Sequence, residues 1–356
     1  DLIIGGDIDL EGSIDVNGTT NLDVLDVDGA VNFAADVTFA DGADIITASA
    51  GTSNFRAGVN AGNSIASGGN YNVVVGDEAG TAITTGDNNV ALGYASLDAL
   101  TTGSTNTGIG SYSLSSNTTA GNNVGVGYFA LKANTTGDYN TVVGTNAGDA
   151  ITIGNSNVAV GSNSLTTEVA GDRSVAVGHG SLALQTNAST VDVYNTAVGY
   201  NSGYAMTTGT NNTLIGGLAG DAITTGSYNS ALGQGALGAN TTGEVNTAVG
   251  ANALLSNTTA SQNTAVGTNA MYANTTGADN TSVGHNTLDA NTTGANNTAI
   301  GQEALGSNTT ASNNTAVGHD AGTVITTGID NTLIGALAGD AITTGSYNTA
   351  VGKSSL

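Results

Sequence analysis

Three histidines are the side chains best suited to acid–base or metal chemistry near neutral pH. His179, His285 and His319 each stand directly after a glycine that follows an aliphatic residue, and other copies of this position hold Tyr, Gln, Lys, Ser or Asp. Such variety is typical of a solvent-facing position. If the copies stack as strands do, His285 and His319 lie about 10 Å apart, too far to share a zinc ion. We therefore expect isolated, exposed histidines. The alternative is that histidines from different chains of an oligomer come close together.

The remaining residues do not form a catalytic set. Paired carboxylates do not recur at the spacing of glycoside hydrolases, and the glycines follow one fixed period, which explains them without a phosphate loop. The absence of cysteine excludes a disulfide scaffold and thiolate metal sites. The pairs Asp7/Asp9 and Asp26/Asp28 offer oxygen ligands of the kind calcium takes, but alternation places them on a wet strand face. We predict no catalytic, cofactor-binding or metal-ligating residue and no enzymatic activity.

The charge balance restricts the partners. The chain has 28 acidic residues against 4 basic ones, and eleven of the acids stand among the first fifty residues. Such a surface repels phosphate backbones and anionic lipid, so we expect no nucleic-acid partner. No apolar run approaches the length that spans a membrane, so no membrane insertion is expected.

A glycine preceded by Val, Ile or Leu recurs along most of the chain. Its intervals are 17 residues throughout, except for one of 21 between Gly178 and Gly199. The seventeen glycines are Gly76, Gly93, Gly110, Gly127, Gly144, Gly161, Gly178, Gly199, Gly216, Gly233, Gly250, Gly267, Gly284, Gly301, Gly318, Gly335 and Gly352. An internal period of this length is typical of stacked repeats that share a continuous core.

Each unit reads as two short strands and two corners. The idealised unit is Asn-Thr-Ala-Val-Gly-x-x-Ala-Leu-x-x-Asn-Thr-Thr-Gly-x-x, in which alternating residues indicate a strand and glycine permits a tight corner. We therefore predict an all-β fold, a parallel β-solenoid or β-roll of 17-residue coils. Its corner glycines include Gly93, Gly110, Gly127, Gly250, Gly267 and Gly318.

The aliphatic residue before each glycine is expected to point to the axis. On this interpretation Val249→Asp buries an unpaired carboxylate and breaks the column locally. The expected core residues are Val126, Val143, Val160, Val198, Ile215, Val249, Val266, Ile300, Val317 and Ile334.

Volume compensation within the units indicates a packed interior. Seven units carry Leu or Met four residues after the glycine and Asn three residues later, as in Leu131 and Asn134. Six other units carry Gly at the first position and a large apolar residue at the second, as in Gly220 and Ile223. One bulky side chain per coil is thus predicted to fill one slot from either position. The residues Leu100, Glu168 and Gln185 break this rule.

Asparagine stands four residues before the glycine in sixteen of the seventeen units, Ser174 being the exception. Stacked coils place these amides about 4.8 Å apart, where they can hydrogen-bond as a ladder. We interpret the column as corner caps that stabilise the stack, with a ligand-binding row as the alternative.

The position after each corner glycine is the candidate contact surface, because Tyr offers broad amphipathic area at low entropic cost. The candidate contact residues are Tyr94, Tyr128, His179, Tyr200, His285 and His319. Ordinary surface decoration is the alternative. The extra residues near 185–194 form either a functional loop or a tolerated insertion.

The first fifty residues follow a different rule. Alternating aliphatic and acidic residues with Asp-Gly and Asn-Gly turns predict an acidic β-stem over residues 1–50, intertwined with identical chains because one ribbon cannot bury its apolar face. The solenoid is then expected over residues 51–356, with an irregular first coil at 55–75. The chain begins without Met and ends partway through a coil, so we expect the native protein to continue past its C-terminus.

The run Asn-Thr-Ala-Val-Gly-x-x-Ala at residues 246–253, 263–270 and 314–321 resembles the head repeat of trimeric autotransporter adhesins. The acidic stem at residues 22–33 followed by the longer repeat is similar to tail fibres of tailed bacteriophages. The head-like resemblance covers roughly residues 55–356, the stem-like one residues 1–50. It implies a left-handed β-roll, a homotrimer and surface binding.

The leading interpretation is a structural and adhesive fibre segment of a phage tail, located on the virion and engaged in host attachment. Its expected partners are copies of itself and a cell-surface receptor, either glycan or protein. The alternative is a trimeric adhesin of the bacterial cell surface. An ice-binding solenoid is a further alternative, because regular Thr columns can order water, but the Thr-Thr sites are interrupted at 166–168 and lack a strict Thr-x-Thr face.

Overall fold

The computed structural model describes residues 49–356. The expected β-stem, with the pairs Asp7/Asp9 and Asp26/Asp28, lies outside the described residues, apart from its last two positions.

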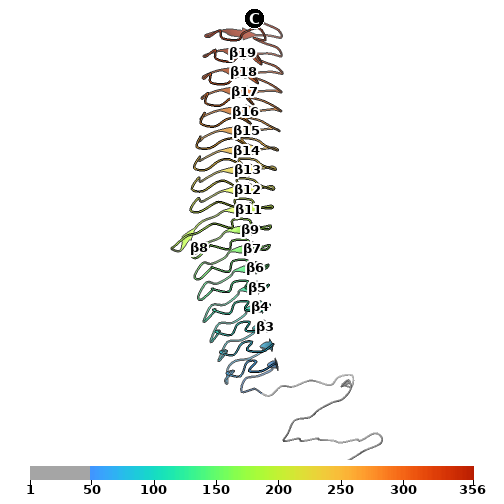
Figure 1. Ribbon diagram of the computed structural model, residues 1–356, viewed down its shortest axis with the longest axis vertical. Coiled ribbons are helices and arrows are strands. Elements are labelled where there is room, and N and C mark those ends of the chain that lie inside the picture. Colours follow the sequence, from blue (N-terminus) through green and yellow to red (C-terminus); the bar gives the residue numbers. More distant parts are fainter. Residues whose placement is uncertain (1–48) are drawn as a thin grey trace, which may run out of the picture. The chain divides into compact units, whose positions relative to one another are not determined.

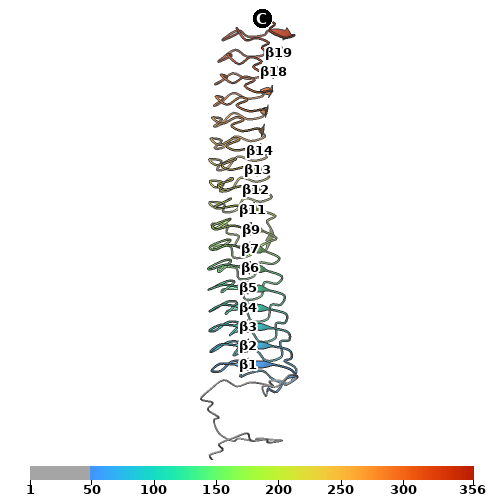
Figure 2. The ribbon, with the colours of Figure 1, turned by 90° about the vertical axis from the view of Figure 1, so that its right-hand side faces the viewer.

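The described unit is a parallel β-solenoid with no α-helix among its described residues. Eighteen short strands, each paired in parallel with the strand of the neighbouring coil, form one continuous sheet along the column (Figures 1 and 2). A separate two-stranded sheet is formed by β8 (Gly171–Asp172) and β10 (Val191–Asp192). The predicted all-β solenoid class is therefore confirmed.

The strands occupy three residues each in the main sheet and two in the small one. They are β1 (Phe55–Ala57), β2 (Val73–Val75), β3 (Val90–Leu92), β4 (Thr107–Ile109), β5 (Val124–Val126), β6 (Thr141–Val143), β7 (Val158–Val160), β8 (Gly171–Asp172), β9 (Val175–Val177), β10 (Val191–Asp192), β11 (Thr196–Val198), β12 (Thr213–Ile215), β13 (Ser230–Leu232), β14 (Thr247–Val249), β15 (Thr264–Val266), β16 (Thr281–Val283), β17 (Thr298–Ile300), β18 (Thr315–Val317), β19 (Thr332–Ile334) and β20 (Thr349–Val351).

Strand register follows the sequence period. Thr247 of β14 pairs with Thr264 of β15, one 17-residue unit later. The first coil is one residue longer, since Phe55 pairs with Val73, and the coil after β9 is four residues longer, since Val175 pairs with Thr196. Both irregularities stay within the stack.

The predicted direction of the strand side chains is wrong. Within every strand of the main sheet except β1 the middle residue is buried, and the residue before the corner glycine faces outward. The ten predicted core residues are therefore half-buried or exposed: Val126, Val198, Val249, Val266 and Val317 are half-buried, and Val143, Val160, Ile215, Ile300 and Ile334 are exposed. The Val249→Asp carboxylate would not lie in the interior.

The error is a one-residue slip in parity, which exchanges the two faces of a strand. The pattern Asn-Thr-Ala-Val lets either Thr and Val or Asn and Ala point inward. In Leu-type units Leu254 and its equivalents already fill the axis. Little room is then left for a strand residue there, so the smaller Ala points inward and the larger Val points outward. Ala248 and Asn246 therefore lie inside, with no exposed area, and Thr247 and Val249 face outward.

The predicted compensation slot is confirmed. Leu131 and Leu254 in Leu-type units, and Ile151 and Ile223 in Gly-type units, have no exposed surface. A Cβ added at Gly220 would lie 2.7 Å from Cδ1 of Ile223, so the isoleucine occupies the space that leucine takes elsewhere.

A third position takes part in this compensation. The middle strand residue is Ala, Gly or Ser in every unit that carries Leu or Met in the slot, but Val or Leu in four Gly-type units, which hold Val74, Val142, Leu214 and Leu333. At Gly322 the space is shared by Ile325, Leu305 and Leu333, which come from three successive coils. Packing is therefore adjusted between coils as well as within them.

The asparagine column forms the predicted ladder, inside the coil. The Oδ1 atom of Asn263 accepts hydrogen bonds from the backbone N and Nδ2 of Asn280, at 3.0 and 3.2 Å. Its own Nδ2 donates to the carbonyl of Gly277 at 2.9 Å. These asparagines are fully buried, so the ladder satisfies polar groups of the interior.

Corner glycines are required by backbone conformation and by space. Gly250 has φ +132°, and a Cβ there would lie 2.5 Å from the carbonyl oxygen of Gly267 in the next coil. Both facts exclude larger residues at this corner.

Two of the three residues that break the slot rule, Glu168 and Gln185, lie at the enlarged coil and hydrogen-bond to each other. The carboxylate of Glu168 is fully buried and accepts hydrogen bonds from the backbone N of Val169, Ala170, Gly171 and Asn187, and from the side chains of Gln185 and Asn187. Gln185 also donates to Ser174 Oγ at 2.8 Å and accepts from Asn195 at 3.0 Å. It thus bridges the ladder where serine interrupts it. Leu100 is simply a second buried apolar residue in its coil.

Replacing Glu168 with Gln is expected to destabilise this coil by about 2–3 kcal/mol, because an amide group would face donors where the carboxylate accepts. Amide hydrogen exchange should accelerate at residues 168–195 and little elsewhere. The matched control is Glu244→Gln, which makes the same change at an exposed position. Equal exchange in the two variants would refute the structural role of the carboxylate.

Candidate functional site

The six predicted contact residues are all exposed. Tyr94, Tyr128, His179, Tyr200, His285 and His319 lie along one corner of the column, directly after the strands of the main sheet. Among them, His179 and Tyr200 stack with their ring centroids 5.6 Å apart. His319 contacts the carboxylate of the adjacent Asp320 at 2.9 Å.

Four aromatic rings gather at one end of this corner. Tyr94 packs edge-on against Tyr112 at 5.2 Å, and Phe129 lies 5.4 Å from Tyr112 and 3.9 Å from Tyr128. The ammonium of Lys132 lies 4.1 Å above the Phe129 ring. Hydrogen bonding and proximity to Tyr112 raise the pKa of Tyr94. The sequence predicted Tyr94 and Tyr128 here and missed Tyr112 and Phe129, which stand one position further on.

A second row of exposed tyrosines was missed by the sequence analysis. Five tyrosines directly precede an asparagine of the ladder, buried in four cases and half-buried at Asn348, and have positive φ: Tyr71, Tyr139, Tyr194, Tyr228 and Tyr347. The recurring dipeptide Tyr-Asn was the available signal. In all, ten of the eleven tyrosines are exposed, so the described surface is rich in rings that can contact a partner.

The extra residues of the enlarged coil lie between Asn187 and Tyr194. They contain β10, which pairs with β8 of the preceding coil, and the chain at β8 extends past its neighbours (Figure 1). An ion pair between Arg173 and Asp192 ties the loop to the preceding coil, and Tyr194 donates a hydrogen bond of 3.0 Å to Asp192 within the loop.

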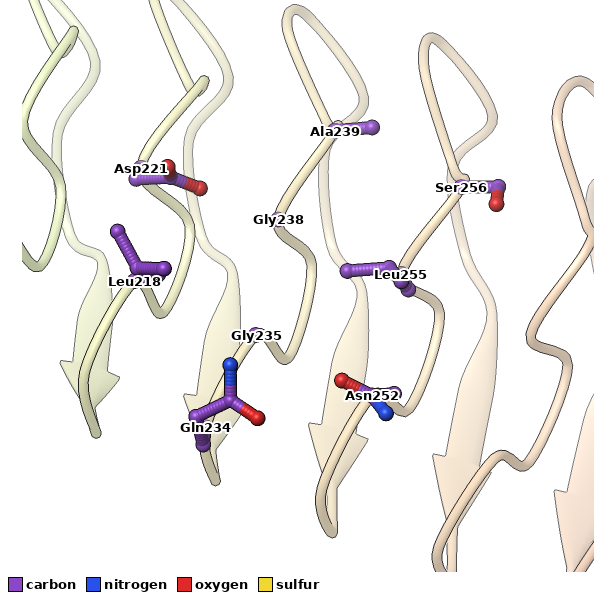
Figure 3. A pocket seen from close by; sticks show the side chains of 9 residues that line it. All are labelled: Leu218, Asp221, Gln234, Gly235, Gly238, Ala239, Asn252, Leu255 and Ser256. Atoms are coloured by element: carbon purple, nitrogen blue, oxygen red, sulfur yellow. The ribbon is translucent and has the colours of Figure 1, made fainter.

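A hollow of about 380 Å³ opens on the face that follows the contact corner. It spans three successive coils, and Asp221 and Leu255 point toward the chain at Gly238 from opposite sides (Figure 3). Gln234 and Asn252 lie at its edge. Burial raises the pKa of the Asp221 carboxyl, as it does for Asp98 and Asp289 at equivalent positions of other coils.

The outer face of the main sheet is uncharged. We define this face by the first and third residues of each strand; the first is Thr or Val in every strand except β1 and β13, and the third is Val, Ile or Leu in every strand except β1. Figure 2 shows these strands stacked along the column. The face therefore presents aliphatic side chains along the column, joined by Thr in β4, β6 and, except for β13, the strands from β11 on.

Two further features of the described residues concern metal binding and membrane spanning. Among residues 49–356 no group of three or more His, Asp or Glu residues is arranged to hold a metal ion. Within the same residues no helix is long and apolar enough to cross a membrane. The exposed side chains described above are aromatic rings, amides and separate carboxylates.

The fold defines the chain as a repetitive β-solenoid. No known protein-family model matches the sequence, and a comparison with curated proteins finds no match.

Proposed function

We propose that this chain is a structural and adhesive segment of a fibre. Copies associate along the outer face of the main sheet, and the aromatic corners contact a receptor on a cell surface. The observation that carries this proposal is the uncharged outer face, which repeats a Thr or Val and an aliphatic side chain along the column.

Charge favours that face as the contact between copies. The chain carries a net charge of −24, so two copies repel each other through most of their surfaces. The outer face holds aliphatic side chains that are left partly exposed, including Leu232 at 50% and Ile334 at 43%. Contiguous apolar surface of this kind supports burial against a partner.

A ring of three copies around an axis parallel to the column fits this geometry. Each chain repeats the same residues at every level, so a rotation about that axis brings identical levels together and closes the assembly. Burying the outer face inside leaves the tyrosine rows on the outside, available to a glycan or protein.

Location on a phage virion, as a tail fibre used in host attachment, is the setting that we propose. A trimeric adhesin of the bacterial cell surface is the alternative. Both settings need a stiff spacer with repeated contact groups, and the solenoid provides the physical properties that either requires.

Ice binding is a second candidate, favoured by one observation. Strands β11 to β20 of the main sheet present Thr followed two residues later by an aliphatic residue, with Ser230 the one replacement for Thr. Such an array could order water only if the outer face stays free. A solution mass equal to a single chain, together with thermal hysteresis, would favour this candidate.

Val249→Cys tests the association. The chain has no cysteine, so one thiol on the outer face reports contact between copies without competing reactions. Since in-register copies bring this position together near the axis, mild oxidation should link most chains into covalent dimers on a denaturing gel. The solution mass of the native chain, measured by light scattering, should equal three chains.

Thr259→Cys is the matched control, because Thr259 is exposed away from the outer face. It should remain unlinked at the same chain concentration. Equal cross-linking at both positions, or the mass of one chain at every concentration, would contradict the proposed assembly.

A further inference from the structure

The hollow around Gly238 arises from a local departure from the repeat. Counted from the corner glycine Gly233, the second and fifth residues are both glycine, Gly235 and Gly238. No other coil of the described solenoid has glycine at both positions. In the preceding coil Leu218 occupies the position equivalent to Gly235, and in the following coil Leu255 occupies the position equivalent to Gly238. The coil of Gly233 lacks both side chains, which leaves a space between the two leucines.

The hollow is lined by both polar and apolar side chains. The Oδ1 atom of Asn252 and Cδ1 of Leu255 lie 3.0 and 3.4 Å from where a Cβ of Gly235 would stand. A carboxylate oxygen of Asp221 lies 3.5 Å from the corresponding point at Gly238. One carboxylate, two side-chain amides and two leucines therefore surround a volume of about 380 Å³, within the range of small-molecule sites.

These groups select a class of ligand. The hollow has no Lys, Arg or His in its lining, so it does not favour phosphate or carboxylate ligands. A partly desolvated carboxylate and amide groups bind hydroxyl groups well, since they accept and donate in fixed directions. Leucine methyl groups suit the apolar C–H face of a ring.

We propose that this hollow is a binding subsite for a neutral saccharide ring. Asp221 and Asn252 accept hydrogen bonds from ring hydroxyls, Gln234 donates to one, and Leu218 and Leu255 contact the apolar ring face. This inference rests on the adhesive part of the proposed function and assigns to it a ligand class and a place.

Exposed tyrosines extend the subsite along the column. Tyr204 and Tyr272 occupy the same position of their coils as Gly238, two coils before and two coils after it. At a rise of about 4.8 Å per coil, each lies about 10 Å from the hollow along the axis. Both are exposed, so neighbouring sugars of an oligosaccharide have aromatic rings to contact on either side.

The solenoid supplies a matched pair of test positions. Asp289 and Gly306 repeat Asp221 and Gly238 four coils later, but the coil of Gly306 carries Glu303 where Gly235 stands. Gly238→Leu should fill the hollow, since the conformation of Gly238 is open to other residues and the nearest atom, 2.9 Å from its Cβ position, is the flexible end of Leu255. Gly306→Leu makes the same change outside the hollow.

The experiment titrates the whole chain with glucose, galactose, mannose and N-acetylglucosamine and with their short oligomers, followed by saturation-transfer NMR. We expect binding of at least one of these sugars, weakened at least tenfold by Gly238→Leu and by Asp221→Asn. Gly306→Leu and Asp289→Asn should bind as the native chain does. Circular dichroism checks that each variant remains folded.

The outcomes separate this inference from the proposed function. Equal binding by Gly238→Leu and the native chain would overturn the subsite while leaving an adhesive fibre in place. No binding of any tested sugar would overturn it too, and the cross-linking of Val249→Cys would still decide the assembly. Binding of methylamine in place of sugars would identify Asp221 as a cation site and refute the saccharide assignment.

Discussion

Ala248→Asp is expected to open the solenoid at β14, at a cost of about 3–5 kcal/mol for an unpaired carboxylate placed in an apolar interior. Ala248 has no exposed area and lies between Ala231 and Ala265 of the adjacent strands. Hydrogen exchange of the amides in residues 230–282 should become at least about 100-fold faster, since each coil is supported only by its neighbours. Exchange in distant coils should change little.

Thr259→Asp is the control for this change. It adds the same charge in an adjacent segment, at a side chain that faces solvent. We expect its effect on stability to stay below about 0.5 kcal/mol. A tolerated aspartate at residue 248, or a disruptive one at 259, would mean that inside and outside have been exchanged.

The second large effect concerns the slot shared by Leu254 and Asn257. Leu254→Gly removes a fully buried side chain and should cost about 2–5 kcal/mol. Asn257→Ile crowds the same slot and should cost about 1–3 kcal/mol. The double variant recreates the arrangement of Gly322 and Ile325, whose strand also has Ala in the middle, so it should be more stable than either single variant. A coupling of about 2 kcal/mol in denaturant unfolding would measure this.

A displaced pair provides the control. Leu254→Gly combined with Asn291→Ile has the same composition, but Asn291 lies in a slot two coils away. Its two costs should simply add, because the sites are separated by about 10 Å. Rescue by the displaced pair would show that the slots are not filled coil by coil.

Periodicity predicted the architecture because a solenoid repeats one local rule. The 17-residue spacing sets the strand register. The slot is filled either by a leucine such as Leu131 or, three positions later in the unit, by an isoleucine such as Ile223, and this alternation indicates a closed interior. The asparagine ladder also followed, since identical residues in stacked strands must lie within hydrogen-bonding reach. Each of these inferences depends on the number of residues between equivalent positions, which can be counted in the sequence.

The side-chain parity could not be predicted in the same way. Both Val249 and Ala248 are apolar, and the choice between them depends on how much room Leu254 leaves at the axis. That room is a property of the coil cross-section. The aromatic cluster at Tyr112 and the hollow at Gly238 depend on contacts between coils, so single-unit patterns indicated neither of them.

Because every coil pairs with the next in the same register, the length of the column can change by whole 17-residue repeats. Deleting residues 246–262 would join Val245 to Asn263. Equivalent positions of the repeat would then still stack on one another in adjacent coils. Each deletion or duplication of this size shortens or lengthens the column by about 4.8 Å without a new interior. A chain built in this way can adjust its reach during evolution while its cross-section stays the same.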